Sequence, residues 1–75
     1  MEPTNSKVLF NYSKVLFEMA DYVNSWKYLT RIPNKTWEVY DFLGDVQHKL
    51  RNLPMMLSYY KKAFQLSRIE EIKKV

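Results

Sequence analysis

Apolar residues recur along this chain at steps of three and four positions, which is the period of an amphipathic helix rather than of a strand. The polar residues 4–6 can supply a cap for the first such helix, which is predicted to run to about Ala20. Its apolar stripe consists of Leu9, Tyr12, Val15, Leu16 and Met19.

A second helix is predicted directly after Asp21, whose carboxylate is expected to accept hydrogen bonds from free backbone amides of the first turn. The helix should stop before Pro33, because a residue that precedes proline avoids the helical conformation. Its apolar residues are Tyr22, Trp26, Leu29 and Ile32.

Two further helices follow the same pattern. The third is predicted to begin at 34–36 and to carry Trp37, Tyr40, Leu43, Val46 and Leu50. Asn52 is the expected cap of the fourth, and Pro54 is tolerated in its first turn. The fourth helix carries Leu57, Tyr60, Ala63 and Phe64 and can continue through Ile69 and Ile72. Four helices with short connections predict an all-α fold of antiparallel hairpins.

The two hairpins look like copies of one unit. Residues 11–22 and 42–53 agree in almost every polar and apolar position, and Asp21 aligns with Asn52. The offset between the copies lies in the range of helix-turn-helix repeat proteins.

Specific residues within the copies carry a family resemblance. The second copy has Tyr40-x-x-Leu43-Gly44, followed by Tyr60 and Ala63 in the segment 57–66. The first copy has Ser13 and Ser25, with Pro33 closing it. In these features the chain resembles the tetratricopeptide repeat (TPR) family.

The resemblance implies two helix-turn-helix hairpins stacked as a short α-solenoid within a single domain, 1–75. The first hairpin would span 6–34, the second 35–68, and a helical extension 69–75. An unrelated four-helix bundle remains the alternative fold.

The family's small residues lie where the two helices of a hairpin cross closely. A glycine inside a helix costs about 1 kcal/mol relative to alanine, so Gly44 needs such a reason. Ser13 and Ser25 would form the equivalent contact in the first hairpin. Met56 stands where a small residue is expected opposite Gly44, and Gln47 replaces a core aromatic residue. Together, the residues expected to carry the structural signature are Ser13, Ser25, Tyr40, Leu43, Gly44, Tyr60 and Ala63.

By the same resemblance, the first helix of each hairpin lines a concave groove. The expected groove residues are Lys7, Phe10, Lys14, Phe17 and Glu18, then Glu38, Asp41, Asp45, His48 and Lys49. Phe10 and Phe17 could anchor a partner peptide or helix. Alternatively, both rings are core, and Lys14 pairs with Asp45. Two aspartates would repel a carboxylate, so the clamp that some family members use for a chaperone's C-terminus is not expected here.

Composition narrows the function classes. The 75 residues include no cysteine and one histidine, so disulfides and a closed zinc site are excluded as stabilisers. A core this small supplies roughly 3–5 kcal/mol, which favours a protein that binds a partner. The line of Glu38, Asp41, Asp45 and His48 could hold a metal, but exposed acidic faces are far commoner. We expect no enzyme, no metal and no cofactor.

The net charge of +4 arises from 12 basic residues that are spread along the chain, against 8 acidic ones. RNA binding through Trp26, Tyr28 and Trp37 is therefore only an alternative, since those rings have core spacing. No segment is apolar enough to span a membrane, and residues 1–7 lack a signal-peptide core, so a cytoplasmic location is expected.

The chain is not expected to be an ideal monomer, because about three repeats are usually needed to bury each other's faces. The C-terminal helix offers apolar residues for a homodimer, at Leu66, Ile69, Ile72 and Val75.

Overall fold

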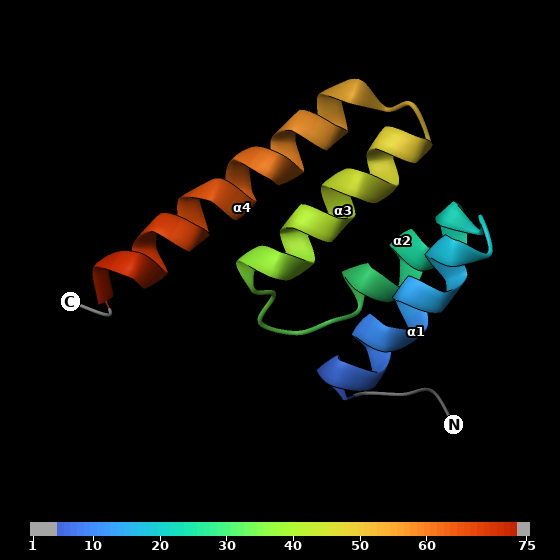
Figure 1. Cartoon of the computed structure of the whole chain (residues 1–75), viewed down its shortest axis with the longest axis horizontal. Helices are drawn as coiled ribbons and strands as arrows, with labels where there is room; N and C mark the ends of the chain where they lie inside the picture. Colours follow the sequence, from blue (N-terminus) through green and yellow to red (C-terminus); the bar gives the residue numbers. More distant parts are fainter. Residues whose placement is uncertain (1–4, 74–75) are drawn as a thin grey trace.

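The computed structural model describes residues 5–73, and this part of the chain is all-α, as predicted (Figure 1). It contains α1 (Ser6–Glu18), α2 (Tyr22–Thr30), α3 (Trp37–Lys49) and α4 (Leu53–Lys73). No strand occurs among the described residues. None of their helices combines the length and the apolar character that crossing a lipid bilayer requires.

Asparagine side chains cap two of the helices. The Oδ1 atom of Asn5 accepts hydrogen bonds from the backbone amides of Lys7, at 2.8 Å, and Val8, at 3.4 Å. The Oδ1 atom of Asn52 accepts from the backbone amide of Met55 at 3.5 Å, in the first turn of α4. These side chains satisfy amides that the start of a helix leaves without partners.

Helix α2 begins where the sequence predicts but is held differently at both ends. Asp21 is the N-cap residue of α2, as predicted, but its carboxylate caps no backbone amide. It accepts a hydrogen bond from the Asn24 side chain at 2.8 Å instead, so the predicted capping hydrogen bond is wrong. The helix ends at Thr30, just before Ile32. Beyond that end, the Lys35 ammonium donates to the carbonyl oxygens of Thr30 and Ile32, at 2.9 and 2.8 Å. A cation at a helix C-terminus stabilises the exposed carbonyl groups there.

The turns α1–α2 and α3–α4 have the same geometry. Ala20 and Arg51 adopt left-handed conformations, with φ angles of 62° and 61°. In each turn the next amide donates to the carbonyl five positions earlier, at 2.8 Å in the first and 2.9 Å in the second. This is the hydrogen-bond pattern of a Schellman motif, in which glycine is usual. Ala20 and Arg51 occupy equivalent positions of the sequence repeat, so the repeat extends to the turn geometry.

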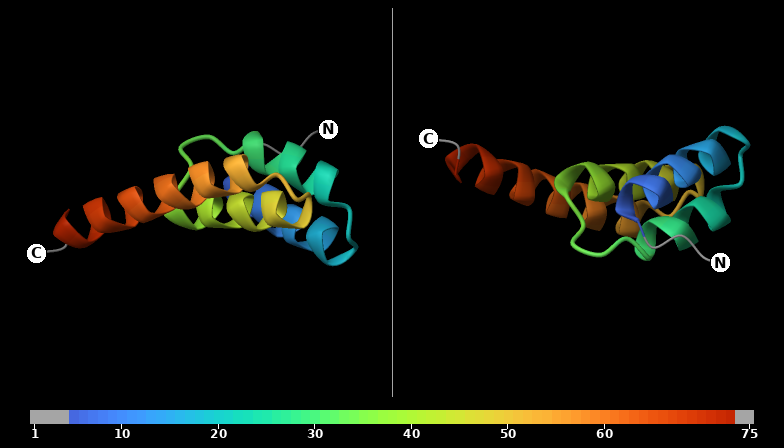
Figure 2. Two further views of the ribbon diagram at one scale, coloured as in Figure 1. Left: turned by 90° about the horizontal axis from the view of Figure 1, so that it is seen from above. Right: turned by 90° about the horizontal axis from the view of Figure 1, so that it is seen from below.

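The helices pair as two antiparallel hairpins, which we call the first hairpin (α1 and α2) and the second hairpin (α3 and α4). Helix α3 lies between α4 and the first hairpin (Figures 1 and 2). One buried cluster joins the two hairpins and consists of Leu9, Leu29, Ile32, Val39, Leu43 and Val46.

Each hairpin has a close helix crossing, but the two are built differently. In the first, Ser13 and Ser25 are fully buried, and the Ser25 hydroxyl donates to the carbonyl oxygen of Ser13 at 2.8 Å. In the second, the ring of Tyr60 lies on Gly44, where a Cβ atom would overlap its Cδ1 and Cε1 atoms. The Tyr60 hydroxyl donates to the Asp45 carboxylate. Gly44 therefore leaves room for an aromatic ring.

The residue whose side chain occupies the space at Gly44 is thus Tyr60, one helical turn beyond Met56. The expectation that Met56 lies opposite Gly44 is corrected accordingly, and Met56 is half-buried. The other signature residues are buried or half-buried in the second hairpin: Tyr40, Leu43 and Ala63.

Gln47 is buried inside the second hairpin with 0% of its surface exposed. Among the described residues, neither its amide nitrogen nor its amide oxygen has a hydrogen-bond partner. A buried polar group without a partner costs roughly 1–3 kcal/mol. At the equivalent position of the first hairpin the chain has the apolar Leu16.

Helix α1 buries only part of the apolar stripe predicted for it. Its buried residues are Leu9, Ser13 and Leu16. Three members of the predicted apolar stripe are instead exposed, at 44% for Tyr12, 51% for Val15 and 70% for Met19. Val8 is also exposed, so the outward face of α1 is largely apolar.

Helix α4 has 21 residues, against 13 in α3, and its C-terminal part extends past the start of α3 (Figures 1 and 2). Leu66 is half-buried, whereas Ile69 and Ile72 are exposed. At steps of three positions these side chains turn gradually around α4, by about 120° from Leu66 to Ile72. Val75 lies outside the described residues.

Candidate interaction groove

A groove runs between α1 and α3, with a volume of 440 Å³. Its apolar part consists of three aromatic rings, those of Phe10, Trp37 and Phe42, and its polar part of Lys14, Glu38, Asp41 and Asp45. All four polar residues were predicted to face a groove, as was Phe10. Trp37 and Phe42 were not assigned to it, although their three- and four-residue spacing to Glu38, Asp41 and Asp45 places them beside the same helix face.

The aromatic rings hold α1 against α3. Phe42 packs edge-on against Phe10, with ring centroids 5.6 Å apart, and against Phe17, at 5.1 Å. Phe17 also packs edge-on against Tyr22 of α2 at 5.2 Å. Such pairs contribute about 0.5–1.5 kcal/mol beyond the area they bury. Phe10 and Phe17 are therefore half-buried interface residues, and only Phe10 also lines the groove.

The carboxylates of α3 create a negative patch on a chain whose net charge is positive. Partial loss of contact with water, followed by the neighbouring Asp45 charge, raises the pKa of Asp41 above its ordinary value, although its side chain remains exposed. The Asp45 carboxylate accepts the hydrogen bond from Tyr60. Burial, that hydrogen bond and both aspartate charges raise the pKa of the Tyr60 phenol. A nearby cation would relieve the repulsion between Asp41 and Asp45.

Lys14, the cationic residue of the groove, contacts an aromatic ring and not a carboxylate. The Lys14 ammonium lies over the ring of Phe10, 4.7 Å from its centroid, in a cation–π contact. Lys14 and Asp45 line the same groove, but the contact found for the Lys14 ammonium is the one with Phe10. Within residues 5–73, no cation of the chain forms an ion pair with Glu38, Asp41 or Asp45.

A second hollow of 230 Å³ lies on the other side of α3, against α4. Trp37 and Asp41 line both hollows, so they form the ridge between them. The α4 side of this hollow consists of Tyr60, Ala63, Phe64 and Ser67. The exposed Phe64 extends the aromatic surface beyond the set predicted from the sequence, because α4 was not expected to contribute to the groove.

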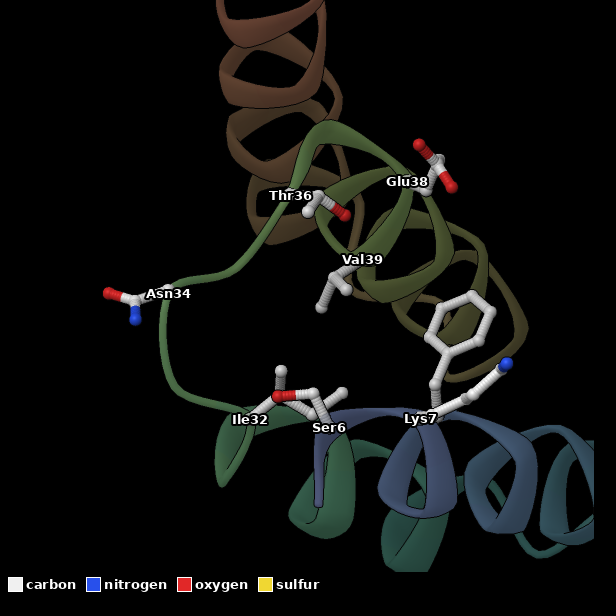
Figure 3. Close-up of a pocket in the computed structure, with 8 residues that line it drawn as sticks. Ser6, Lys7, Ile32, Asn34, Thr36, Glu38 and Val39 are labelled. Carbon is white, nitrogen blue, oxygen red and sulfur yellow. The ribbon is translucent and has the colours of Figure 1, made fainter. Parts of the chain in front are cut away.

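The remaining predicted groove residues lie apart from these hollows. His48 and Lys49 are exposed at the end of α3, and Glu18 is exposed at the end of α1. Lys7 borders a smaller pocket of 190 Å³ between the first turn of α1 and the start of α3 (Figure 3).

Figure 3 shows Ile32 and Val39 facing each other across this small pocket, whereas Asn34 and Glu38 point away from it. Its volume is below the range of about 300–1,000 Å³ that is typical of small-molecule sites. The pocket is therefore a gap at the junction of the two hairpins rather than a ligand site.

The metal hypothesis gains no support from the geometry. Across residues 5–73, no three His, Asp or Glu side chains converge in a way that could hold a metal ion. Glu38, Asp41, Asp45 and His48 do share one side of α3, but they are strung along it.

Comparison with models of known protein families, with curated proteins and with solved structures gives no match. The resemblance to the tetratricopeptide repeat family accordingly rests on the residues of this chain alone.

Proposed function

We propose that this chain is a protein-interaction module of two stacked, tetratricopeptide-like hairpins, and that its groove binds a peptide or helix of a partner protein. The observation that carries the proposal is the combination of three aromatic rings with three carboxylates in one open groove. Buried aromatic anchors provide most of the affinity of protein interfaces, and charges provide orientation and selectivity.

The charge of the groove favours a partner segment that carries lysine or arginine beside apolar residues. Glu38, Asp41 and Asp45 have no cationic partner within the described chain, so a bound cation would gain attraction without breaking an existing ion pair. A carboxylate ligand would be repelled, as expected from the sequence.

Selection from a displayed peptide library, followed by titration of the selected peptides, tests this proposal. Asp41→Lys reverses an exposed charge in the groove and should weaken binding about tenfold or more, equivalent to ~1.4 kcal/mol. Glu70→Lys makes the same charge change on the exposed part of α4 and should leave the affinity unchanged. Equal affinity of both variants for every selected peptide would contradict the proposed groove.

RNA binding is a weaker candidate, because its proposed rings are partly engaged within the fold. The Trp26 indole donates to the Tyr59 hydroxyl at 3.4 Å, and the rings of Tyr28 and Tyr12 are 4.9 Å apart. A steep dependence of single-strand binding on salt concentration would favour RNA over a protein partner.

We propose no catalytic role and no cofactor, since open hollows do not enclose a reacting group. A cytoplasmic location remains part of the proposal. The second candidate function is a structural unit that associates with itself, and the exposed apolar face of α1 favours it.

A further inference from the structure

Helix α1 has an apolar stripe that the described chain covers only at Tyr12, whose ring packs edge-on against Tyr28 of α2. Val8, Tyr12, Val15 and Met19 are all large, apolar and exposed, and we call them the α1 stripe. Their spacing of four, three and four positions places them on one face over three turns, which is the pattern of a helix that packs against other helices.

The aligned residues of the second hairpin show how such a stripe packs when another helix covers it. When the first copy is aligned on the second, the α1 stripe coincides with four residues of α3: Val39, Leu43, Val46 and Leu50. Three of these belong to the buried cluster, and Leu50 packs against it half-buried. In α3 this stripe packs on the first hairpin, whose Leu29 and Ile32 belong to the same cluster.

The residues of α2 that lie on the other side of this contact also align with exposed residues, which belong to α4. Tyr22 and Trp26 of α2 are half-buried and pack against the same cluster. The same alignment matches them to Leu53 and Leu57 of α4, which are 54% and 63% exposed. We call Leu53 and Leu57 the α4 patch.

We infer that the α1 stripe of one copy of this chain packs on the α4 patch of a second copy, and so repeats between molecules the contact that joins the two hairpins within one. The α1 stripe is uncovered along its length, and the α4 patch is the uncovered part of the other half, in the register that the internal contact uses. The rest of that half is not free, because Leu29 and Ile32 align with Tyr60 and Ala63, which are half-buried and buried. Repeat proteins usually end in polar capping faces, whereas both of these faces expose large apolar side chains.

This arrangement is heterologous, because two different surfaces meet and each copy keeps one of each free. Such contacts continue from copy to copy unless the rotation closes a ring. The net charge of +4 on each copy opposes association, so added salt should strengthen it by screening the repulsion. The proposed groove interaction has the opposite dependence, because there salt weakens an attraction.

Sedimentation analysis over a wide range of concentrations tests the inference. For the unchanged chain, the average mass should rise with concentration from 9.1 kDa to twice that value and beyond. Val15→Glu blocks the stripe and Leu57→Glu blocks the patch; each variant alone should remain at the monomer mass. An equimolar mixture should form a dimer and nothing larger, since each variant supplies the surface that the other lacks.

Both substitutions replace exposed side chains, and circular dichroism checks that the helices persist. Lys7→Gln and Ser58→Glu change the charge equally at exposed positions outside the stripe and the patch, and should associate like the unchanged chain. A constant monomer mass of the unchanged chain overturns the inference. Dimers of the Leu57→Glu variant alone also overturn it, because they would show a contact that does not use the patch. Association that is lost only with Ile69→Glu would place the contact at the C-terminal part of α4 and would overturn it as well.

Discussion

The two hairpins have nearly the same turn geometry, but different residues lie where their helices cross. In the first, two small serines meet, and the hydroxyl of one satisfies a backbone carbonyl of the other helix. In the second, a glycine receives a large ring whose hydroxyl reaches a carboxylate at the edge of the groove.

The difference shows that the same turn geometry can accompany two different kinds of helix crossing. The serine contact is closed within the fold, since both side chains are fully buried. The Gly44–Tyr60 contact opens towards the groove through Asp45, so the second crossing links the core of the hairpin to the proposed binding surface. The following changes test this comparison, beginning with the largest expected effect.

Gly44→Leu should have the largest effect, because its Cβ alone would overlap the ring of Tyr60. Overpacking costs about 1–3 kcal/mol or more, against a total stability of roughly 3–5 kcal/mol for a core of this size. Thermal unfolding followed by circular dichroism should show a large loss of stability. In a Tyr60→Ala background, Gly44→Ala should cost less than in the unchanged chain, and equal costs would show that the ring is not the obstacle.

Gln47→Met should stabilise the protein, because it replaces a buried amide without partners by an apolar side chain of similar shape. The free energy of unfolding in denaturant should rise by about 1–3 kcal/mol. The exposed Gln65 provides the matched control, and Gln65→Met should change little. A loss of stability in Gln47→Met would mean that the amide has a partner in solution.

Ser25→Ala removes the hydrogen bond to the Ser13 carbonyl and should cost about 0.5–1.5 kcal/mol. Ser58→Ala, at an exposed position of α4, should cost nearly nothing. Equal effects of the two changes on denaturant unfolding would imply that the small size of Ser25, and not its hydroxyl, closes the first crossing.

Tyr60→Phe should have a small effect that depends on pH. The folded state raises the pKa of Tyr60 above the ordinary value of 10.0, so above about pH 10 the unfolded chain loses this proton first. The stabilisation from the Tyr60 phenol is therefore complete below that pH and declines above it. The stability difference between the unchanged chain and Tyr60→Phe should shrink as the pH rises past this value. A difference that stays constant over this range would mean that the pKa is not raised.

The sequence was sufficient to predict the number, order and approximate bounds of the helices, because proline, asparagine and the turn residues mark their ends. It was not sufficient to decide which face of α1 is buried. The predicted stripe spans two rows of that helix: the row of Leu9 and Leu16, which also contains Ser13, is buried, and the row of Tyr12, Val15 and Met19 is exposed. The neighbouring helices select the row that contains Ser13, since only a small residue fits the crossing with Ser25.

The groove was predicted in part for a similar reason. The charged residues Lys14, Asp41 and Asp45 follow from the repeat alignment, because each faces outward on the first helix of its hairpin. Phe42 and Tyr60 could not be assigned in this way, since their contacts depend on how closely α1, α3 and α4 approach one another. Likewise, whether Met56 or Tyr60 lies against Gly44 depends on how α3 and α4 are rotated relative to each other. Periodicity does not determine that rotation.

The extra length of α4 gives this helix two parts that differ in local stability, one packed beside α3 and one exposed. Up to Ser67 its residues lie beside α3, whereas those from Arg68 onward are exposed as far as Ile72. Backbone amides in the exposed turns rely on intrahelical hydrogen bonds alone and can open without disturbing the core. In hydrogen–deuterium exchange, deuterium should therefore enter these last turns first, and a protease should cut there before it reaches the hairpins. Covering of these turns by another molecule would be visible as slower exchange at those amides.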